Sequence, residues 1–184
     1  MWFHLKMKGV CSMSALVDAV ATLVPIVDPR LSGSISSCAN TPIPMEVALA
    51  MTAVIKAVAD QMEKEGRVFR GLPISCIFTG SDSFTTRLDE NQCAICVKLA
   101  VYPLPRLLPH RSTFRLYTAL AEELCHLIWD IADETLINFK VLEVLRNLHP
   151  QLTLSDLYSE AAVAECVQYA QDHQELGLSP LLPG

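Results

Sequence analysis

The chain has 184 residues, of which 51% are hydrophobic and 18% are charged, and its mean hydropathy is +0.32. This apolar content excludes an intrinsically disordered chain, and the length predicts a single domain spanning residues 1–184. The net charge of −6 originates in residues 111–184, which hold four basic and eleven acidic side chains, so we expect no binding to nucleic acid.

The hydropathy and the cysteine content both indicate the cellular compartment of the chain. No apolar stretch reaches the roughly 18 uncharged residues that a membrane-spanning helix needs, and Asp18 lies in the middle of the first one, which argues against a secretion signal. The seven cysteines are an odd number, and most lie among apolar residues, as reduced thiols do in a core. We therefore expect a cytoplasmic protein without disulfides and without a membrane partner.

Helices are predicted within residues 14–65. Apolar residues at helical spacing predict a short helix that begins at Ser14 and is stopped by Pro25. Small polar residues over 30–41 predict a loop. A long helix then follows Pro42 and is ended by Gly66.

The apolar period changes to about two after residue 66, which predicts strands within 67–102. Turn residues separate the short apolar runs, so the simplest arrangement is an antiparallel meander. The predicted strands lie at 68–70, 74–79, 84–88 and 93–102. The pair Cys93 and Cys96 falls inside the last of these, so we expect strand cysteines rather than half of a zinc site.

Three prolines over 103–109 end the strands, and a helix is predicted over 112–131. Further helices are predicted within 134–173, and the last of them begins at a capping box formed by Thr153 and Asp156. The sequence thus predicts an α+β fold: N-terminal helices, a small antiparallel sheet and a C-terminal helical portion. Leu124 is expected on the buried side of helix 112–131.

Helix 112–131 also carries an unusual concentration of acids around one histidine. At 100° per residue, Glu122 and Glu123 share a face with His126, and the residues that follow continue this face. A histidine with carboxylates one turn away can bind a divalent metal. The candidate metal ligands are Glu122, His126, Asp130, Asp133 and Glu134.

The segment 114–126, Phe-Arg-Leu-Tyr-Thr-Ala-Leu-Ala-Glu-Glu-Leu-Cys-His, resembles the active-site helix of zincin metallopeptidases, especially the small cytoplasmic zincin-like domains of bacteria and phages. Their motif is His-Glu-x-x-His, and the resemblance extends over about residues 74–145. It implies a zinc-dependent peptidase in which Glu123 is the general base and His126 is a zinc ligand. Glu122 stands where the motif has its first histidine. The third ligand is left open among Asp130, Asp133, Glu134 and Glu143.

Three interpretations of this face stay open. It can be a solvated acidic surface, because the outer side of an amphipathic helix is normally charged. It can be an altered zincin site that binds zinc and hydrolyses peptides. It can also be a zincin-like scaffold without metal, which acts as an interaction or inhibitory module and binds a basic protein or peptide partner through its acidic C-terminal surface.

Overall fold

The computed structural model describes residues 23–82, 97–110 and 114–178. Three parallel strands form the sheet, in the order β1 (Ile35–Ala39), β2 (Ile74–Thr79) and β3 (Lys98–Pro103). Ile35 pairs with Ile74, and Ile74 pairs with Lys98. The fold is mixed α/β, but the prediction of an antiparallel meander is wrong.

The long helix α1 (Met45–Lys64) connects β1 to β2, so the first half of the chain is a β-α-β unit. Such a connection is what makes two neighbouring strands parallel. The helix is confirmed within three residues of its predicted start, and Gly66, with φ of +61°, lies just beyond its end. The predicted loop over 30–41 is wrong because it contains β1, and the predicted strand 68–70 is an irregular segment.

The second half of the chain is helical. The short helices α2 (Leu104–Leu107) and η3 (Leu108–His110) lead to α3 (Phe114–Trp129) and α4 (Glu134–Leu145). The capping box at Thr153 is confirmed, but it begins a single turn, α5 (Leu154–Leu157), and Ser159 caps a separate helix α6 (Glu160–Asp172). Two further 3-10 turns are η2 (Pro29–Leu31) and η4 (Gln174–Leu176).

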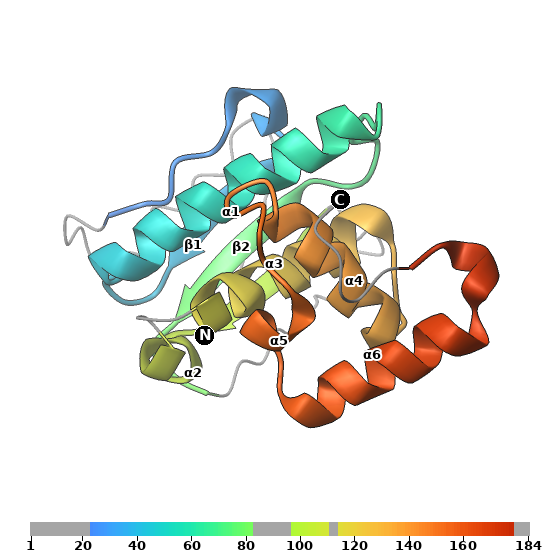
Figure 1. The fold of residues 1–184 in the computed structure, drawn as a ribbon. Helices are drawn as coiled ribbons and strands as arrows, with labels where there is room; N and C mark the ends of the chain where they lie inside the picture. Colours follow the sequence, from blue (N-terminus) through green and yellow to red (C-terminus); the bar gives the residue numbers. More distant parts are fainter. Residues whose placement is uncertain (1–22, 83–96, 111–113, 179–184) are drawn as a thin grey trace, which may run out of the picture.

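Helices α1 and α3 lie side by side across the sheet, with α4 packed against both (Figure 1). The sheet face beneath them carries Ile74, Cys76, Phe78, Ala100 and Tyr102, all of which are buried. Leu124 is fully buried on the inner side of α3, as predicted. Helix α6 lies at the periphery and buries only Cys166 (Figure 1).

Three of the cysteines, Cys76, Cys125 and Cys166, are buried thiols outside any disulfide. Burial raises the pKa of the Cys76 thiol to about 12, so this sulfur is a core hydrophobe and not a nucleophile. The predicted helix at 14–24, the predicted strand 84–88 and the pair Cys93 and Cys96 lie outside the described residues. Among the described helices, none combines the length and the apolar character needed to cross a membrane.

Candidate metal centre

The C-terminal end of α3 is held in place by side chains from three other segments. Lys98 of β3 donates from Nζ to the carbonyl oxygen of Leu127 at 2.9 Å, and Arg67 donates to the carbonyl oxygen of Ile128 at 3.2 Å. These cations satisfy carbonyl groups that the end of a helix leaves unpaired. Trp129 donates from Nε1 to the carboxylate of Glu65 at 2.7 Å. The last turns of α3 are therefore fixed relative to β3 and α1.

A tight turn then brings the start of α4 back to α3. Asp130 has a φ of +56°, the left-handed conformation that ends the helix and that Asp tolerates better than most residues. Asp133 caps α4, and its carboxylate accepts a hydrogen bond from the backbone N–H of Leu136 at 2.8 Å. Glu134 is the first residue of α4, so its side chain starts from a fixed point beside α3.

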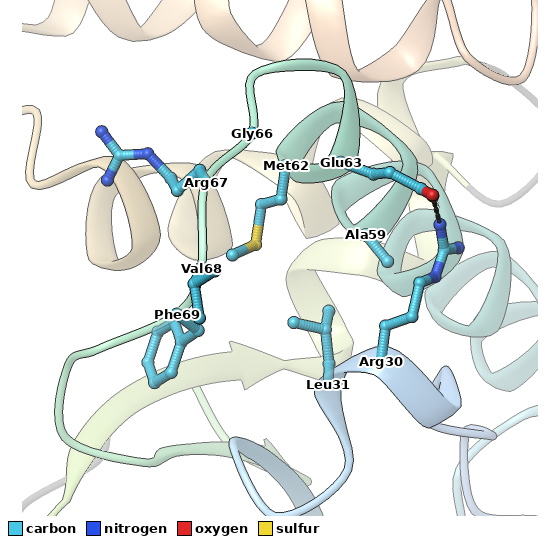
Figure 2. Close-up of a pocket in the computed structure, with 9 residues that line it drawn as sticks. All are labelled: Arg30, Leu31, Ala59, Met62, Glu63, Gly66, Arg67, Val68 and Phe69. Carbon is cyan, nitrogen blue, oxygen red and sulfur yellow. Dashed lines mark hydrogen bonds and ion pairs between the residues drawn. The ribbon is translucent and has the colours of Figure 1, made fainter.

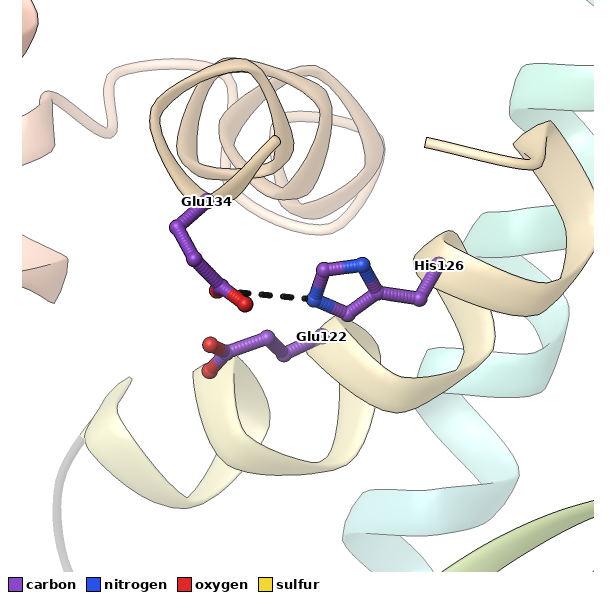
Figure 3. A group of neighbouring side chains, drawn as sticks. All are labelled: Glu122, His126 and Glu134. Atoms are coloured by element: carbon purple, nitrogen blue, oxygen red, sulfur yellow. Dashed lines mark ion pairs between the residues drawn. The ribbon is translucent and has the colours of Figure 1, made fainter. Parts of the chain in front are cut away.

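Glu122, His126 and Glu134 converge at this turn; we call them the Glu/His cluster (Figure 3). One ligand atom from each lies within 4.8 Å of the other two. The Nε2 atom of His126 is 3.6 Å from a carboxylate oxygen of Glu134. Figure 3 shows both carboxylates on the Nε2 side of the imidazole ring. The cluster combines a half-buried glutamate, a half-buried histidine and an exposed glutamate.

The orientation of the imidazole is set by a backbone hydrogen bond. Nδ1 of His126 lies 2.6 Å from the carbonyl oxygen of Ile131, and a carbonyl oxygen only accepts, so Nδ1 carries the proton. In the neutral ring Nε2 then presents its lone pair toward the two carboxylates. A histidine whose other nitrogen donates to a backbone carbonyl is the usual arrangement of a metal-binding imidazole.

The electrostatics of Glu122 are unfavourable for an isolated carboxylate. Burial raises the pKa of Glu122, and the nearby negative charge of Glu134 raises it further, while His126 opposes the shift. Within the described residues, no lysine or arginine makes an ion pair with Glu122 or Glu134. In the part of the chain that the structure describes, the cluster therefore holds two acids without a permanent cation to balance them.

The structure divides the predicted site residues into two groups. It brings together Glu122, His126 and Glu134, which are three of the five candidate ligands. It does not bring Asp130 or Asp133 to them: the Asp130 side chain is 95% exposed and lies 3.8 Å from Lys98, while Asp133 is occupied as a helix cap. Glu123 is exposed on α3, and Glu143 pairs with Lys140.

A separate pocket of about 370 Å³ lies between the end of α1 and the irregular segment that follows (Figure 2). Its inner surface is apolar and includes Leu31, Met62 and Phe69, and Arg30 lies at its edge. Arg30 is occupied by three carboxylates, so it is not available to a ligand. The pocket shares no residue with the Glu/His cluster.

Comparison with known proteins identified no relative of this chain. No family model matches the chain, and no curated protein or solved structure shows a significant match to it.

Proposed function

We propose that the chain is a zincin-like, zinc-dependent hydrolase that holds its metal through Glu122, His126 and Glu134. The observation that carries the proposal is the orientation of His126: Nδ1 donates to Ile131, which leaves Nε2 directed at the carboxylates of Glu122 and Glu134. One imidazole and two carboxylates are three ligands, and catalytic zinc sites have three protein ligands and leave the fourth position to water.

The spacing of the cluster is compatible with this ion. Ligands at roughly 2.0–2.2 Å from a tetrahedral zinc lie about 3.4 Å from one another. The 3.6 Å separation of His126 and Glu134 is close to that value, and the ligand atoms of all three residues lie within 4.8 Å of one another. A bound zinc would draw the more distant atoms closer by rotation of the side chains. The exposed side chain of Glu134 has the freedom to make this adjustment.

Bound zinc would supply an acidified water molecule and a Lewis acid for an amide carbonyl. The protein residues supply the rest of the chemistry. Glu122 and Glu134 bind as carboxylates, and the backbone carbonyl of Ile131 fixes the tautomer of His126. Glu123 is the proposed general base, because it stands where the zincin motif has its catalytic glutamate, and it is exposed on α3.

The experiment is a calorimetric titration of the metal-free protein with zinc. The parent is expected to bind zinc, and His126→Ala and Glu134→Gln are expected to lose more than about 100-fold in affinity, since each removes a direct ligand. The matched control is Asp130→Asn, which removes one nearby negative charge, is accepted at positive φ, and should leave the affinity unchanged. Absence of zinc binding by the parent contradicts the proposal.

Catalysis is tested separately from binding. Hydrolysis of a mixture of unstructured fluorogenic peptides should depend on zinc and stop when a chelator is added. Glu123→Gln should retain zinc affinity but lose hydrolysis, because general-base catalysis contributes typically 10²–10⁴-fold. A Glu123→Gln variant as active as the parent would remove Glu123 from the mechanism.

A second function is favoured by the surface of the C-terminal helices. Glu160, Glu165, Asp172 and Glu175 are all exposed on α6 and η4, and α6 buries a single side chain. A protonated His126 could satisfy the two glutamates as an ion pair, without any metal. The chain would then be an interaction module for a basic protein or peptide. This function predicts no zinc binding by the parent and salt-sensitive binding of a lysine-rich peptide that is weakened by Glu160→Gln and Glu165→Gln.

A further inference from the structure

The outer side of the first half of α1 is apolar, although it faces away from the core. Met45 and Leu49 lie one turn apart on this side, and they are 60% and 63% exposed. The segment 23–28 runs alongside this half of α1 (Figure 1), where the backbone N–H of Ile26 donates to Oγ1 of Thr52 at 2.9 Å. The segment adds three more exposed apolar side chains. We call the whole set the α1 patch; it consists of Leu23, Val24, Ile26, Met45 and Leu49.

The α1 patch is unusual for the surface of a soluble domain, where exposed apolar side chains are normally scattered singly. Ten large apolar side chains are exposed in the described part of the chain, and five of them belong to this patch. Pro25 is buried between Val24 and Ile26, so the segment is anchored with these two side chains outward. The first half of α1 is apolar almost all round, and a helix of that kind is normally covered on every side.

The charged residues that border the α1 patch already have partners within the chain. Lys56 lies 2.6 Å from Asp60, and Asp60 also binds Arg30. Glu46, the one charged residue in the sequence 45–55, is half-buried and interacts within the chain. Among the described residues, the patch therefore presents no free charge that would select an acidic or a basic partner.

We propose that the α1 patch is the interface of a homodimer, in which the patch of one copy packs against the patch of a second copy. In a two-fold interface the same residues face each other, so the surface must be complementary to itself. An apolar surface without free charges meets this condition. The inference does not depend on the proposed zinc function, because the patch shares no residue with the Glu/His cluster.

The charge distribution favours a second copy as the partner. The chain has a net charge of −6, so two copies repel each other over most orientations. The exposed acids of α6 lie on the side of the molecule away from the first half of α1 (Figure 1). Two copies that meet through the α1 patch therefore keep these acids apart. A lipid surface fits less well, because helices that bind membranes usually carry lysine and arginine beside their apolar face.

The test measures the mass of the full chain in solution by light scattering. Leu49→Asp places a negative charge within the α1 patch, and the matched control Val68→Asp places it on an apolar residue that is 68% exposed outside the patch. The parent and Val68→Asp should have twice the 20.3 kDa mass of the chain. Leu49→Asp should be monomeric, with a dissociation constant raised by at least about 100-fold, because like charges then face each other in a desolvated interface.

A pair of complementary variants tests whether the partner is a second copy. Leu49→Lys alone should also be monomeric, for the same reason as Leu49→Asp. An equimolar mixture of the two variants should regain the mass of a dimer, since opposite charges then meet across the interface. A mixture that stays monomeric overturns the proposal.

A parent that is monomeric at about 100 µM also overturns the proposal. If that monomer sediments with phosphatidylcholine vesicles, the α1 patch binds a lipid surface instead. If Leu49→Asp lowers the melting temperature of that monomer, the patch is covered within the same chain. A Leu49→Asp variant that stays dimeric overturns it as well, because the two copies then meet elsewhere.

Discussion

Two groups of carboxylates in this protein have opposite electrostatic surroundings. Around Arg30, the carboxylates of Asp28, Asp60 and Glu63 lie 2.8, 2.7 and 2.6 Å from guanidinium nitrogens. The hydrogen bonds from Arg30 lower the pKa of Asp28 to about 2. In the Glu/His cluster the corresponding position is taken by an imidazole, and the pKa of Glu122 is raised.

Among the described residues, the difference separates an acidic group that has a permanent positive charge from one that has none. A guanidinium is always charged and can donate to several carboxylates at once, so the group around Arg30 is complete within the protein. An imidazole is a titratable group and also a metal ligand. In the proposed function, a divalent cation takes in the Glu/His cluster the place that Arg30 has in the other group.

The largest loss of stability is expected from emptying the core beneath the Glu/His cluster. Leu124 is fully buried on α3, between the turns that carry Glu122 and His126. Leu124→Ala should reduce the free energy of unfolding by about 2–5 kcal/mol, measured by urea denaturation. Glu123→Ala, its exposed neighbour, is the control and should change it by less than about 0.5 kcal/mol. Equal effects of the two changes would mean that the helix faces are wrongly assigned.

A smaller loss of stability is expected from replacing Arg30, the cation that the carboxylates of Asp28, Asp60 and Glu63 share. Arg30→Gln should lower the melting temperature at pH 7, because three carboxylates lose their shared partner. The lowered pKa of Asp28 stabilises the folded protein above about pH 4, and this contribution is lost as the pH falls toward 2. The difference in melting temperature between parent and variant should therefore shrink over that pH range. A difference that grows at low pH would be inconsistent with this role.

The smallest effect, and one of opposite sign, is expected at Glu122. A raised carboxyl pKa means that the folded protein is favoured below the pKa of the unfolded chain and loses this advantage as the pH rises through the folded pKa. Without metal, Glu122→Gln should therefore raise the melting temperature at pH 7 and leave it nearly unchanged at pH 4. If the variant melts lower than the parent at pH 7, Glu122 is a structural ion-pair partner of His126 instead.

The strand pairing could not be predicted because one strand has no recognisable pattern. The segment Ile35–Ala39 reads Ile-Ser-Ser-Cys-Ala, which lacks the alternation of apolar residues that marks a strand. Without β1, the long helix over Met45–Lys64 could not be recognised as a crossover, and the remaining strands were most simply joined as antiparallel neighbours. The helix itself was predictable, since Gly66 ends a clear apolar stripe.

The site was predictable within one helix but not beyond it. The helical period places Glu122 and His126 on one face, and the structure keeps them together. The choice among Asp130, Asp133 and Glu134 depends on the turn between two helices. The left-handed conformation of Asp130 and the capping role of Asp133 direct these two carboxylates elsewhere, and Glu134 is left to face His126.

The most direct test of the central claim is X-ray absorption spectroscopy at the zinc edge of the protein loaded with one equivalent of zinc. The account predicts a single imidazole and oxygen ligands at about 2.0–2.2 Å, with no sulfur. The signal from the imidazole should disappear in His126→Ala. Sulfur scattering at about 2.3 Å, or two or more imidazoles, would place the metal on other cysteines or histidines and would contradict a centre built from Glu122, His126 and Glu134.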